Sequence, residues 1–251
     1  MRFERPNESH LPQLWRIWGE SFDDPDELIA DFARTAFSPN RARIALENDV
    51  PVAALYWFDC TWNGERLAYL YAIATDKNFR GRGICSRLME DTHRHFKALG
   101  YAGALLVPSE ESLFSFYRRM GYETACTVDV VNCTAEAGDL ALTKIDKDEY
   151  AALRRAYLPK GGVIQEGETL DFLETWVSFW KGEGFLLAAY PQNDRLIGAE
   201  LLGNVSLAPQ IVHALGYEKG SFQTVGEGHP FAMYLSLKDV PAPSYLGLAL
   251  D

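Results

Sequence analysis

The first half of the chain alternates short apolar runs that read as strands with longer segments of helical spacing. The clearest helix covers residues 83–99, because its apolar positions recur every three or four residues and Gly100, a common helix-ending residue, follows. Asn48 and Asp49 separate two strand-like runs and predict a tight turn. We predict strands at residues 1–5, 43–47, 52–61, 67–75, 102–107 and 123–132, and helices at 9–19, 28–36, 83–99 and 111–120. This alternation indicates an α/β or α+β domain.

A short polar segment, residues 134–139, follows and predicts a linker between two domains. Beyond it we predict strands at 140–145, 185–190, 195–202, 217–225 and 231–237, and helices at 147–157, 171–180 and 208–215. The aromatic residues Phe172, Trp176, Phe179 and Trp180 would then share the helix at 171–180. The predicted domains are residues 1–133 and 140–251.

The two predicted domains show a weak internal similarity. Residues 116–123 and 211–218 both read as a helix end, a glycine and the aromatic start of a strand, and a hairpin precedes each. In the first domain a long segment with a glycine-rich loop lies between hairpin and helix, and the second domain lacks it. We therefore expect the second domain to be a degenerate copy without that loop. The alternative is chance, because helix–glycine–strand units are common.

Composition narrows the classes of function. The formal net charge is -11, which argues against a nucleic-acid partner. No segment approaches the roughly 20 apolar residues of a membrane span, and the first residues form no apolar leader, so we expect no membrane partner and no secretion. The cysteines form no Cys-x-x-Cys pair, which gives no indication of a metal site or a disulfide framework. We expect a cytoplasmic protein.

A glycine-rich loop, Arg80-Gly81-Arg82-Gly83-Ile84-Cys85-Ser86, stands between the predicted strand 67–75 and the helix 83–99. Glycines permit a tight turn and close approach of a ligand, and the start of a helix presents unpaired N–H groups with a partial positive charge. With two arginines added, the loop predicts a pyrophosphate site. It is not a P-loop, because Gly-Lys-Ser/Thr is missing, and it is not a G-x-G-x-x-G dinucleotide-binding loop, because Ser86 followed by Arg87 stands where the third glycine would be.

Two motifs resemble those of GNAT acetyltransferases. Arg80-x-x-Gly83-x-Cys85 is similar to the family's R/Q-x-x-G-x-G/A motif, and residues 110–122, EESLFSFYRRMGY, resemble its N-x-x-A-x-x-F-Y-x-x-x-G-F stretch. Their order and spacing match the family over residues 1–132. The resemblance implies a mixed, largely antiparallel sheet flanked by helices, with acetyl-CoA as cosubstrate. The chain departs from the motifs at Cys85, at Glu110 (usually Asn) and at Leu113 (usually Ala).

The resemblance also implies roles for individual residues. Ile73, Ala74 and Thr75 match the strand whose backbone binds the pantetheine arm of CoA. The pyrophosphate would be bound by Arg80, Gly81, Arg82, Gly83, Ile84, Cys85 and Ser86. Tyr117 matches the tyrosine near the CoA sulfur, where a phenol with a pKa of about 10 can protonate a leaving thiolate whose acid has a pKa of about 8.5. The alternative for each is an ordinary packed side chain.

The base that deprotonates an attacking amine is less evident. An ammonium has no lone pair, so it must lose a proton before or during attack. The predicted strand 67–75 contains no Asp or Glu, which leaves Asp59, Glu65 and Glu110 as candidates and Tyr69 and Tyr71 as relays. We assign Glu110 as the candidate catalytic carboxylate.

Cys85 has the position of a helix N-terminus, where the pKa of a thiol falls and nucleophilicity at neutral pH rises. No histidine lies near it in the sequence, and the expected ligand would cover it, so we do not expect covalent catalysis. His93 and His95 fall in the long helix and are expected at its surface.

The predicted function is N-acetyl transfer from acetyl-CoA to a primary amine by direct attack in a ternary complex. The acceptor would be a small-molecule amine or a peptide amine. The alternative is a non-catalytic acyl-CoA-binding sensor, suggested by the departures at Glu110 and Leu113 and by the missing strand carboxylate. We expect a monomer, because an internal repeat can form a pseudo-dimer within one chain, and a homodimer is the alternative.

Overall fold

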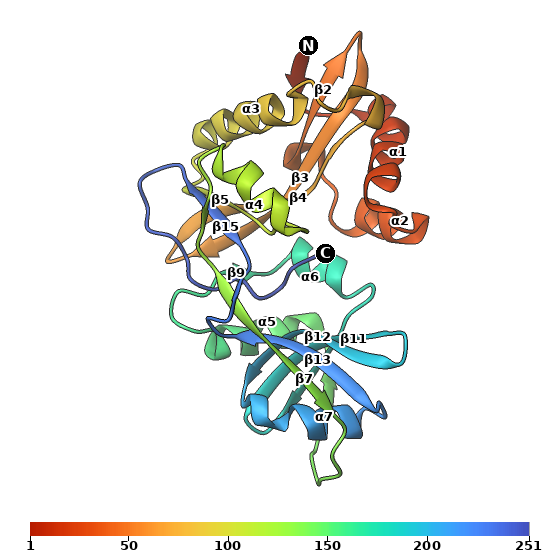
Figure 1. Cartoon of the computed structure of the whole chain (residues 1–251), viewed down its shortest axis with the longest axis vertical. Coiled ribbons are helices and arrows are strands. Elements are labelled where there is room, and N and C mark those ends of the chain that lie inside the picture. Colours follow the sequence, from red (N-terminus) through yellow and green to blue (C-terminus); the bar gives the residue numbers. More distant parts are fainter. Residues whose placement is uncertain (251) are drawn as a thin grey trace. The chain divides into compact units, whose positions relative to one another are not determined.

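The computed structural model describes residues 1–250 as two compact units, each with its own sheet (Figure 1). The first unit comprises Met1–Cys60, Gly64–Glu123 and Tyr234–Pro241. The second comprises Thr61–Asn63, Thr124–Met233 and the residues from 242 onward. Each unit therefore joins segments that are distant in the sequence. The domains predicted from the sequence, residues 1–133 and 140–251, were continuous and did not include this exchange.

The sheet of the first unit follows the order β1-β2-β3-β4-β5-β15-β6. Its strands are β1 (Arg2–Glu4), β2 (Ala42–Glu47), β3 (Val50–Trp62), β4 (Glu65–Thr75), β5 (Gly103–Leu106), β15 (Met233–Ser236) and β6 (Glu123–Thr124). Asn48 and Asp49 have positive φ angles of 50° and 63°, as a tight hairpin turn requires, so the predicted turn between β2 and β3 is confirmed. β4 and β5 run parallel, and the chain crosses between them through α3.

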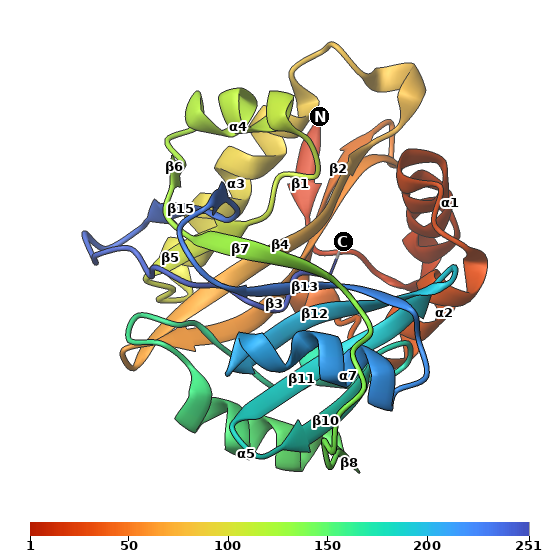
Figure 2. The same ribbon diagram turned by 60° about the horizontal axis from the view of Figure 1, so that its bottom comes forward.

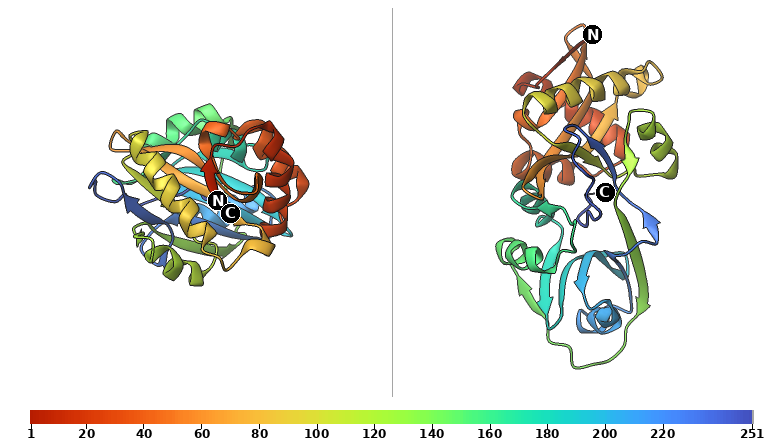
Figure 3. Two further views of the ribbon diagram at one scale, coloured as in Figure 1. Left: turned by 90° about the horizontal axis from the view of Figure 1, so that it is seen from above. Right: turned by 90° about the vertical axis from the view of Figure 1, so that its left-hand side faces the viewer.

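Helices cover both faces of the first sheet, with α1 and α2 on one face and α3 on the other (Figure 3). The helical segments are η1 (Glu8–His10), α1 (Leu11–Phe22), α2 (Asp26–Thr35), η2 (Pro39–Arg41), η3 (Lys77–Phe79), α3 (Ile84–Ala98) and α4 (Glu111–Arg118). Two neighbouring residues of β3 contact helices on opposite faces of the sheet. The ring centroid of Phe58 lies 6.0 Å from that of Phe32 of α2, and the ring centroid of Trp57 lies 4.9 Å from that of Phe96 of α3. Because successive strand side chains point to opposite faces, this sheet is buried on both sides.

The sheet of the second unit follows the order β14-β7-β13-β12-β11-β10-β8. Its strands are β14 (His229–Pro230), β7 (Thr127–Thr134), β13 (Lys219–Val225), β12 (Arg195–Gly203), β11 (Phe185–Gln192), β10 (Ser178–Gly182) and β8 (Thr143–Ile145). The remaining segments are α5 (Lys147–Tyr157), β9 (Ile164–Gln165), α6 (Glu168–Leu173), η4 (Val205–Leu207) and α7 (Ala208–Ala214). β12 and β13 run parallel, and β7 lies antiparallel beside β13 (Figure 2).

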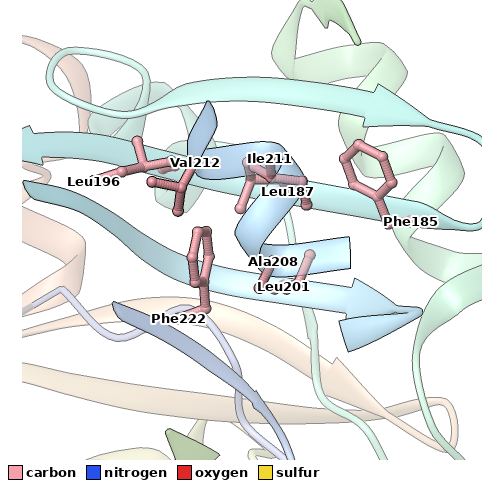
Figure 4. Packing of buried hydrophobic residues seen from close by; sticks show 9 residues of the cluster. Phe185, Leu187, Leu196, Leu201, Ala208, Ile211, Val212 and Phe222 are labelled. Carbon is pink, nitrogen blue, oxygen red and sulfur yellow. The ribbon is translucent and has the colours of Figure 1, made fainter. Parts of the chain in front are cut away.

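A compact apolar cluster fixes α7 on one face of the second sheet (Figure 4). Ile211 and Val212 of the helix pack against Leu187, Leu201 and Phe222 of the strands, and all five side chains are inaccessible to solvent. Burial of such side chains contributes about 1.5–3 kcal/mol each, which holds the short helix in place.

Both sheets contain strands from the other half of the sequence, and the first sheet also includes β9, which pairs with β3. In the first sheet β15 lies between β5 and β6, and in the second sheet β7 lies between β13 and β14. Two connecting segments, 125–126 and 231–232, are joined to each other: the N–H groups of Ala125 and Cys126 donate to the Ala232 carbonyl at 3.0 and 3.1 Å, and Phe231 N–H donates to the Cys126 carbonyl at 2.9 Å. The two halves have therefore exchanged equivalent strands.

The matching strand orders also define how the halves correspond. Each parallel pair, β4/β5 and β12/β13, is linked by a helix, so α7 corresponds to α3 by topology. Our sequence comparison instead matched α7 with α4. The sequence Ala98-Leu99-Gly100-Tyr101 at the end of α3 recurs unchanged as Ala214-Leu215-Gly216-Tyr217 at the end of α7. Both glycines adopt positive φ, 81° and 80°, and end their helices.

The predicted helix at 171–180 is wrong. Helix α6 ends at Leu173, and Phe179 and Trp180 belong to strand β10, which pairs with β11 and with β8. Strand pairing on both sides overrides the helical spacing of the aromatic residues, which also favour strands. The predicted strand 123–132 is two strands, β6 and β7, because its ends belong to different sheets.

Candidate active site

The glycine-rich loop runs from the end of β4 through η3 to the start of α3. Gly81 and Gly83 have φ angles of 76° and 68°, which glycine adopts without strain. No described atom lies within 4 Å of a Cβ built on either residue. Gly83 is the N-cap of α3, Ile84 is buried, and Cys85 and Ser86 are half-buried. The N–H groups at the start of α3 are thus reached over an open loop, an arrangement suited to an anion.

The two arginines of the loop are exposed. Arg80 donates from Nε to the Thr75 carbonyl at 3.0 Å, and Arg82 donates from Nη2 to the Asn78 carbonyl at 3.2 Å. Arg82 also lies 3.7 Å from a Glu47 carboxylate oxygen. These contacts hold both guanidinium groups beside the loop, where they add positive charge to that of the helix N-terminus.

Asp76 anchors the loop to α1 and was not identified from the sequence. It is 4% exposed, accepts a hydrogen bond from Asn78 N–H at 2.9 Å, and forms an ion pair with Arg16 of α1. Burial acts to raise the pKa of Asp76, but the Asn78 N–H and Arg16 outweigh it, so the pKa falls and the carboxylate stays ionised. Lys77 and Glu20, 3.3 Å apart, form a second link between loop and α1. The available sequence signal was an Asp two residues before Asn, typical of a side-chain-capped turn.

β4 and β5 pair over a short stretch and then separate. The parallel register ends at Tyr69 opposite Leu105, whereas β4 continues to Thr75. Ala72 has a positive φ of 46°, which interrupts the regular strand geometry. The predicted arm-binding residues Ile73, Ala74 and Thr75 lie beyond this irregularity. Their backbone does not take part in the pairing with β5, which is what binding of an extended ligand along β4 requires. Their binding role stays a prediction.

Tyr117 is on α4 and packs against two neighbouring aromatic rings. Its side chain is 7% exposed, with its ring 5.2 Å from that of Phe116 and 5.9 Å from that of Tyr122. Burial raises the pKa of Tyr122 well above its usual range, and the Tyr117 and Cys85 side chains raise it further. Tyr122 contacts α3 through His93, whose Nε2 lies 2.8 Å from the Tyr122 hydroxyl. Tyr117 is thus linked through the Tyr122 ring to α3, the helix that the loop precedes, and its catalytic role stays a prediction.

The chemistry of Cys85 and His93 is set by burial. Burial raises the pKa of the Cys85 thiol to about 11, so the group is protonated at neutral pH and is a poor nucleophile. His93 is half-buried rather than a surface residue, and its Nε2 lies 2.8 Å from the Tyr122 hydroxyl. His95 is also half-buried, with its ring 6.2 Å from that of Trp57. The surface expectation for both histidines was wrong, because α3 presents them to aromatic neighbours.

The candidate bases are engaged or exposed. Glu110 is exposed at the N-cap of α4, and its carboxylate accepts a hydrogen bond from the Ser112 hydroxyl. Asp59 accepts from the Tyr101 hydroxyl and from Arg66 Nη2, the latter at 2.8 Å.

The remaining candidates are also accounted for by packing or pairing. Glu65 lies 4.0 Å from Lys238 Nζ in the same unit. Tyr69 and Tyr71 are buried, with their rings 6.3 Å and 5.5 Å from that of Phe58. These tyrosines belong to the aromatic layer between the sheet and α1–α2, and their relay role stays a prediction.

A groove of about 790 Å³ lies between α1 and α2 in the first unit. It is lined by Trp15, Arg16, Gly19, Glu20, Asp26, Ile29, Ala30, Ala33 and Arg34. Arg16 and Glu20 also bind the loop residues Asp76 and Lys77, so one wall of this groove is linked directly to the glycine-rich loop.

The second unit lacks the corresponding loop. The pairing of β12 with β13 resumes at Leu201 opposite Thr224 after an irregularity at Gly198, so these strands do not separate as β4 and β5 do. α7 has 7 residues and carries Pro209 near its start. A proline removes one of the N–H donors that an anion site requires. The expectation of a second GNAT-like half without the loop is confirmed at the level of fold.

Within residues 1–250, no helix combines the length and apolar character that crossing a membrane requires. The same residues contain no cluster of three or more His, Cys, Asp or Glu side chains arranged to hold a metal ion.

Comparison with known proteins identifies the fold. The profile of the acetyltransferase (GNAT) domain matches residues 2–125. A GCN5-related N-acetyltransferase from Kribbella flavida is 17% identical, with a TM-score of 0.69 over 94% of this chain and 72% of that one. A GCN5-related N-acetyltransferase from Anabaena variabilis is 15% identical, with a TM-score of 0.70 over the same shares. Eis1 from Mycobacterium abscessus is 13% identical, with a TM-score of 0.70 over 95% of this chain and 74% of that one.

No curated protein matches the chain significantly. At these identities the structural likeness establishes the fold, and because it covers 94–95% of the chain it includes the second unit. The matched residues 2–125 contain the glycine-rich loop, the separated strands and Tyr117. Residues 2–125 are therefore a GNAT acetyltransferase domain, and the protein is an acyltransferase.

Proposed function

We propose that the protein transfers the acetyl group of acetyl-CoA to a primary amine, by direct attack of the amine in a ternary complex. The observation that supports the proposal is that an open glycine loop at the start of α3, the end of β4 beyond its pairing with β5, and Tyr117 on α4 occur together in the GNAT domain. They would supply an anion site for the pyrophosphate, a slot for the pantetheine arm and a proton donor for the sulfur of CoA.

The chain's own groups divide the binding of CoA between them. The first N–H groups of α3, with Arg80 and Arg82, would bind the pyrophosphate, because they combine hydrogen-bond donors with positive charge. The backbone of Ile73, Ala74 and Thr75 would bind the amides of the pantetheine arm. The Thr75 Oγ1 atom is buried without a hydrogen-bond partner among the described residues, which leaves one further polar group in this stretch.

In the chemical step, the amine nitrogen forms a bond to the thioester carbonyl carbon and the carbon–sulfur bond breaks. The electron pair of that bond leaves with sulfur, and Tyr117 donates its phenolic proton to the thiolate. The amine loses one proton to a base, for which Glu110 is the candidate because its carboxylate is exposed at the start of α4. A thiol, rather than a thiolate, then departs, which disfavours the reverse attack.

The alternative proposal is an acyl-CoA-binding protein that catalyses no transfer. It is favoured by one observation: Asp59 and Glu65, the carboxylates on β3 and β4, are already paired with cations. In that case CoA binds to the same loop, and Tyr117 only packs against it.

Release of CoA thiol from acetyl-CoA in the presence of a panel of primary amines distinguishes the two. We expect turnover with at least one amine, and Tyr117→Phe should lower kcat about 100-fold while changing the Kd for CoA less than about two-fold. The matched control is Tyr234→Phe, since this buried tyrosine of the same unit donates only a 3.5 Å hydrogen bond to the Val240 carbonyl. Unchanged kcat in Tyr117→Phe would contradict the acid role, and CoA binding without turnover on any amine would favour the sensor.

A further inference from the structure

A hydroxyl group is buried at residue 122, directly after the glycine that closes α4. Tyr122 stands where the family stretch quoted above has phenylalanine, and its side chain is 1% exposed. A buried hydroxyl without a partner costs about 1–3 kcal/mol, so the extra oxygen needs a hydrogen bond. Its partner is His93 on α3, with Nε2 2.8 Å from the phenolic oxygen.

The protonation states of this pair follow from burial. Burial, and then the charge of Lys97, lower the pKa of His93 to about 4, so its imidazole is neutral near neutral pH. The pKa of Tyr122 is raised well above its usual range, mainly by burial, so its hydroxyl keeps its proton. Tyr122 therefore donates to His93 Nε2, and the ring proton of His93 is on Nδ1. A neutral hydrogen bond joins α3 to the segment that follows α4.

This bond connects the two elements that carry the reaction. α3 begins with the loop and Cys85, and α4 holds Tyr117 one turn before Tyr122. The Tyr122 ring lies 5.9 Å from that of Tyr117 and 5.5 Å from that of His93. A shift of Tyr122 would move Tyr117 relative to the start of α3.

We propose that Tyr122 and His93 are positioning residues for acyl transfer, and that their hydrogen bond fixes the Tyr117 hydroxyl at the distance from the α3 N-terminus that the leaving sulfur requires. The inference rests on the proposed function, because it acts through Tyr117. Misplacement of a reacting group by about 1 Å can lower a rate about 100-fold. Loss of the hydrogen bond with the aromatic ring retained should cost less, about 10-fold in kcat.

The test is a double-mutant cycle with Tyr117→Phe and Tyr122→Phe, measured with the amine that gives the highest turnover. Tyr122→Phe alone should lower kcat about 10-fold with the KM for acetyl-CoA changed less than about two-fold. In the Tyr117→Phe background the same substitution should change kcat less than about two-fold, because nothing is left to position. An equal loss in both backgrounds would overturn the inference while leaving the acid role of Tyr117 intact. An inert Tyr117→Phe, or no turnover in the unaltered protein, would overturn both.

Variants of the histidine separate positioning from general stability. Gln places an acceptor oxygen near the position of Nε2, so His93→Gln should retain most of the activity, and His93→Leu should reproduce Tyr122→Phe. His95→Leu is the matched control, because His95 is half-buried on the same helix but faces Trp57. It should leave kcat unchanged. If His93→Leu lowers Tm without lowering kcat, the pair is structural only and the inference is wrong.

Discussion

Replacing Glu200 by Gln should strongly destabilise the second unit. The Glu200 carboxylate is 0% exposed and accepts hydrogen bonds from Arg154 Nε at 2.6 Å and Nη2 at 2.9 Å. It also accepts from the hydroxyls of Tyr150 at 2.7 Å and Tyr245 at 3.0 Å. An amide has one acceptor oxygen and would present its NH2 group to these donors. The charge of Arg154 would then remain buried without a counter-charge.

The magnitude follows from two independent values. Removal of one partner of a buried ion pair costs about 3–5 kcal/mol. Loss of two charge-assisted hydrogen bonds, at about 1.5–3 kcal/mol each, gives about 3–6 kcal/mol. For a protein of this size a loss of about 1 kcal/mol lowers Tm by about 2–4 °C, so we expect a decrease of about 6–20 °C.

The neighbouring residue of α5 supplies the control. Arg155 binds Glu166 with the same two-point geometry, at 2.6 and 2.5 Å, but these side chains are 62% and 28% exposed. Glu166→Gln should leave the unfolding midpoint unchanged within error, because exposed ion pairs contribute little. Urea unfolding followed by circular dichroism measures both variants. Equal midpoints for Glu200→Gln and Glu166→Gln would refute the reasoning from burial.

Two further predictions concern the first unit. A Cβ at Gly103 on β5 would lie 2.2 Å from the Tyr234 ring on β15, so Gly103→Ala should lower the free energy of unfolding by about 1–3 kcal/mol. Tyr234→Ala should lower it less in the Gly103→Ala background than alone, and additive losses in thermal unfolding would contradict the placing of β15 beside β5. The pKa of His93 is about 4 in the folded protein and about 6.5 in the unfolded chain, so unfolding takes up a proton between pH 4 and pH 6.5. The free energy of unfolding therefore falls by up to about 3 kcal/mol as the pH decreases through this range. His93→Gln should remove that part of the pH dependence, and an unchanged pH profile of unfolding would show that His93 does not titrate as described.

Local patterns predicted the elements of the first unit and the loop well. The helix predicted at 147–157 has the observed bounds of α5, and the long helix, the tight turn at Asn48-Asp49 and the loop Arg80–Ser86 occur where spacing and glycine positions placed them. These features depend on residues close together in the sequence, which is why a single sequence specifies them.

The exchanged strands could not be read from the sequence. β6 and β7 form one apparent strand, since only two residues, Ala125 and Cys126, separate them, and nothing local shows that each belongs to a different sheet. The bond between His93 and Tyr122 and the ion pair between Arg16 and Asp76 join residues from different elements, so periodicity does not reveal them. The repeat of Ala98–Tyr101 at 214–217, by contrast, was present in the sequence and gives the correct correspondence of α3 with α7.

The binding of CoA at the loop tests the central claim most directly. Gly83 and Gly100 lie at opposite ends of α3 with φ angles of 68° and 81°, and no described atom lies within 4 Å of a Cβ built on either. Replacement by Ala should therefore cost each variant a similar amount, about 1–2 kcal/mol of backbone strain. Calorimetric titration with CoA should show binding to the unaltered protein and to Gly100→Ala with similar Kd, and binding to Gly83→Ala at least about 10-fold weaker. Equal affinity in Gly83→Ala and Gly100→Ala, or no CoA binding by the unaltered protein, would contradict the account.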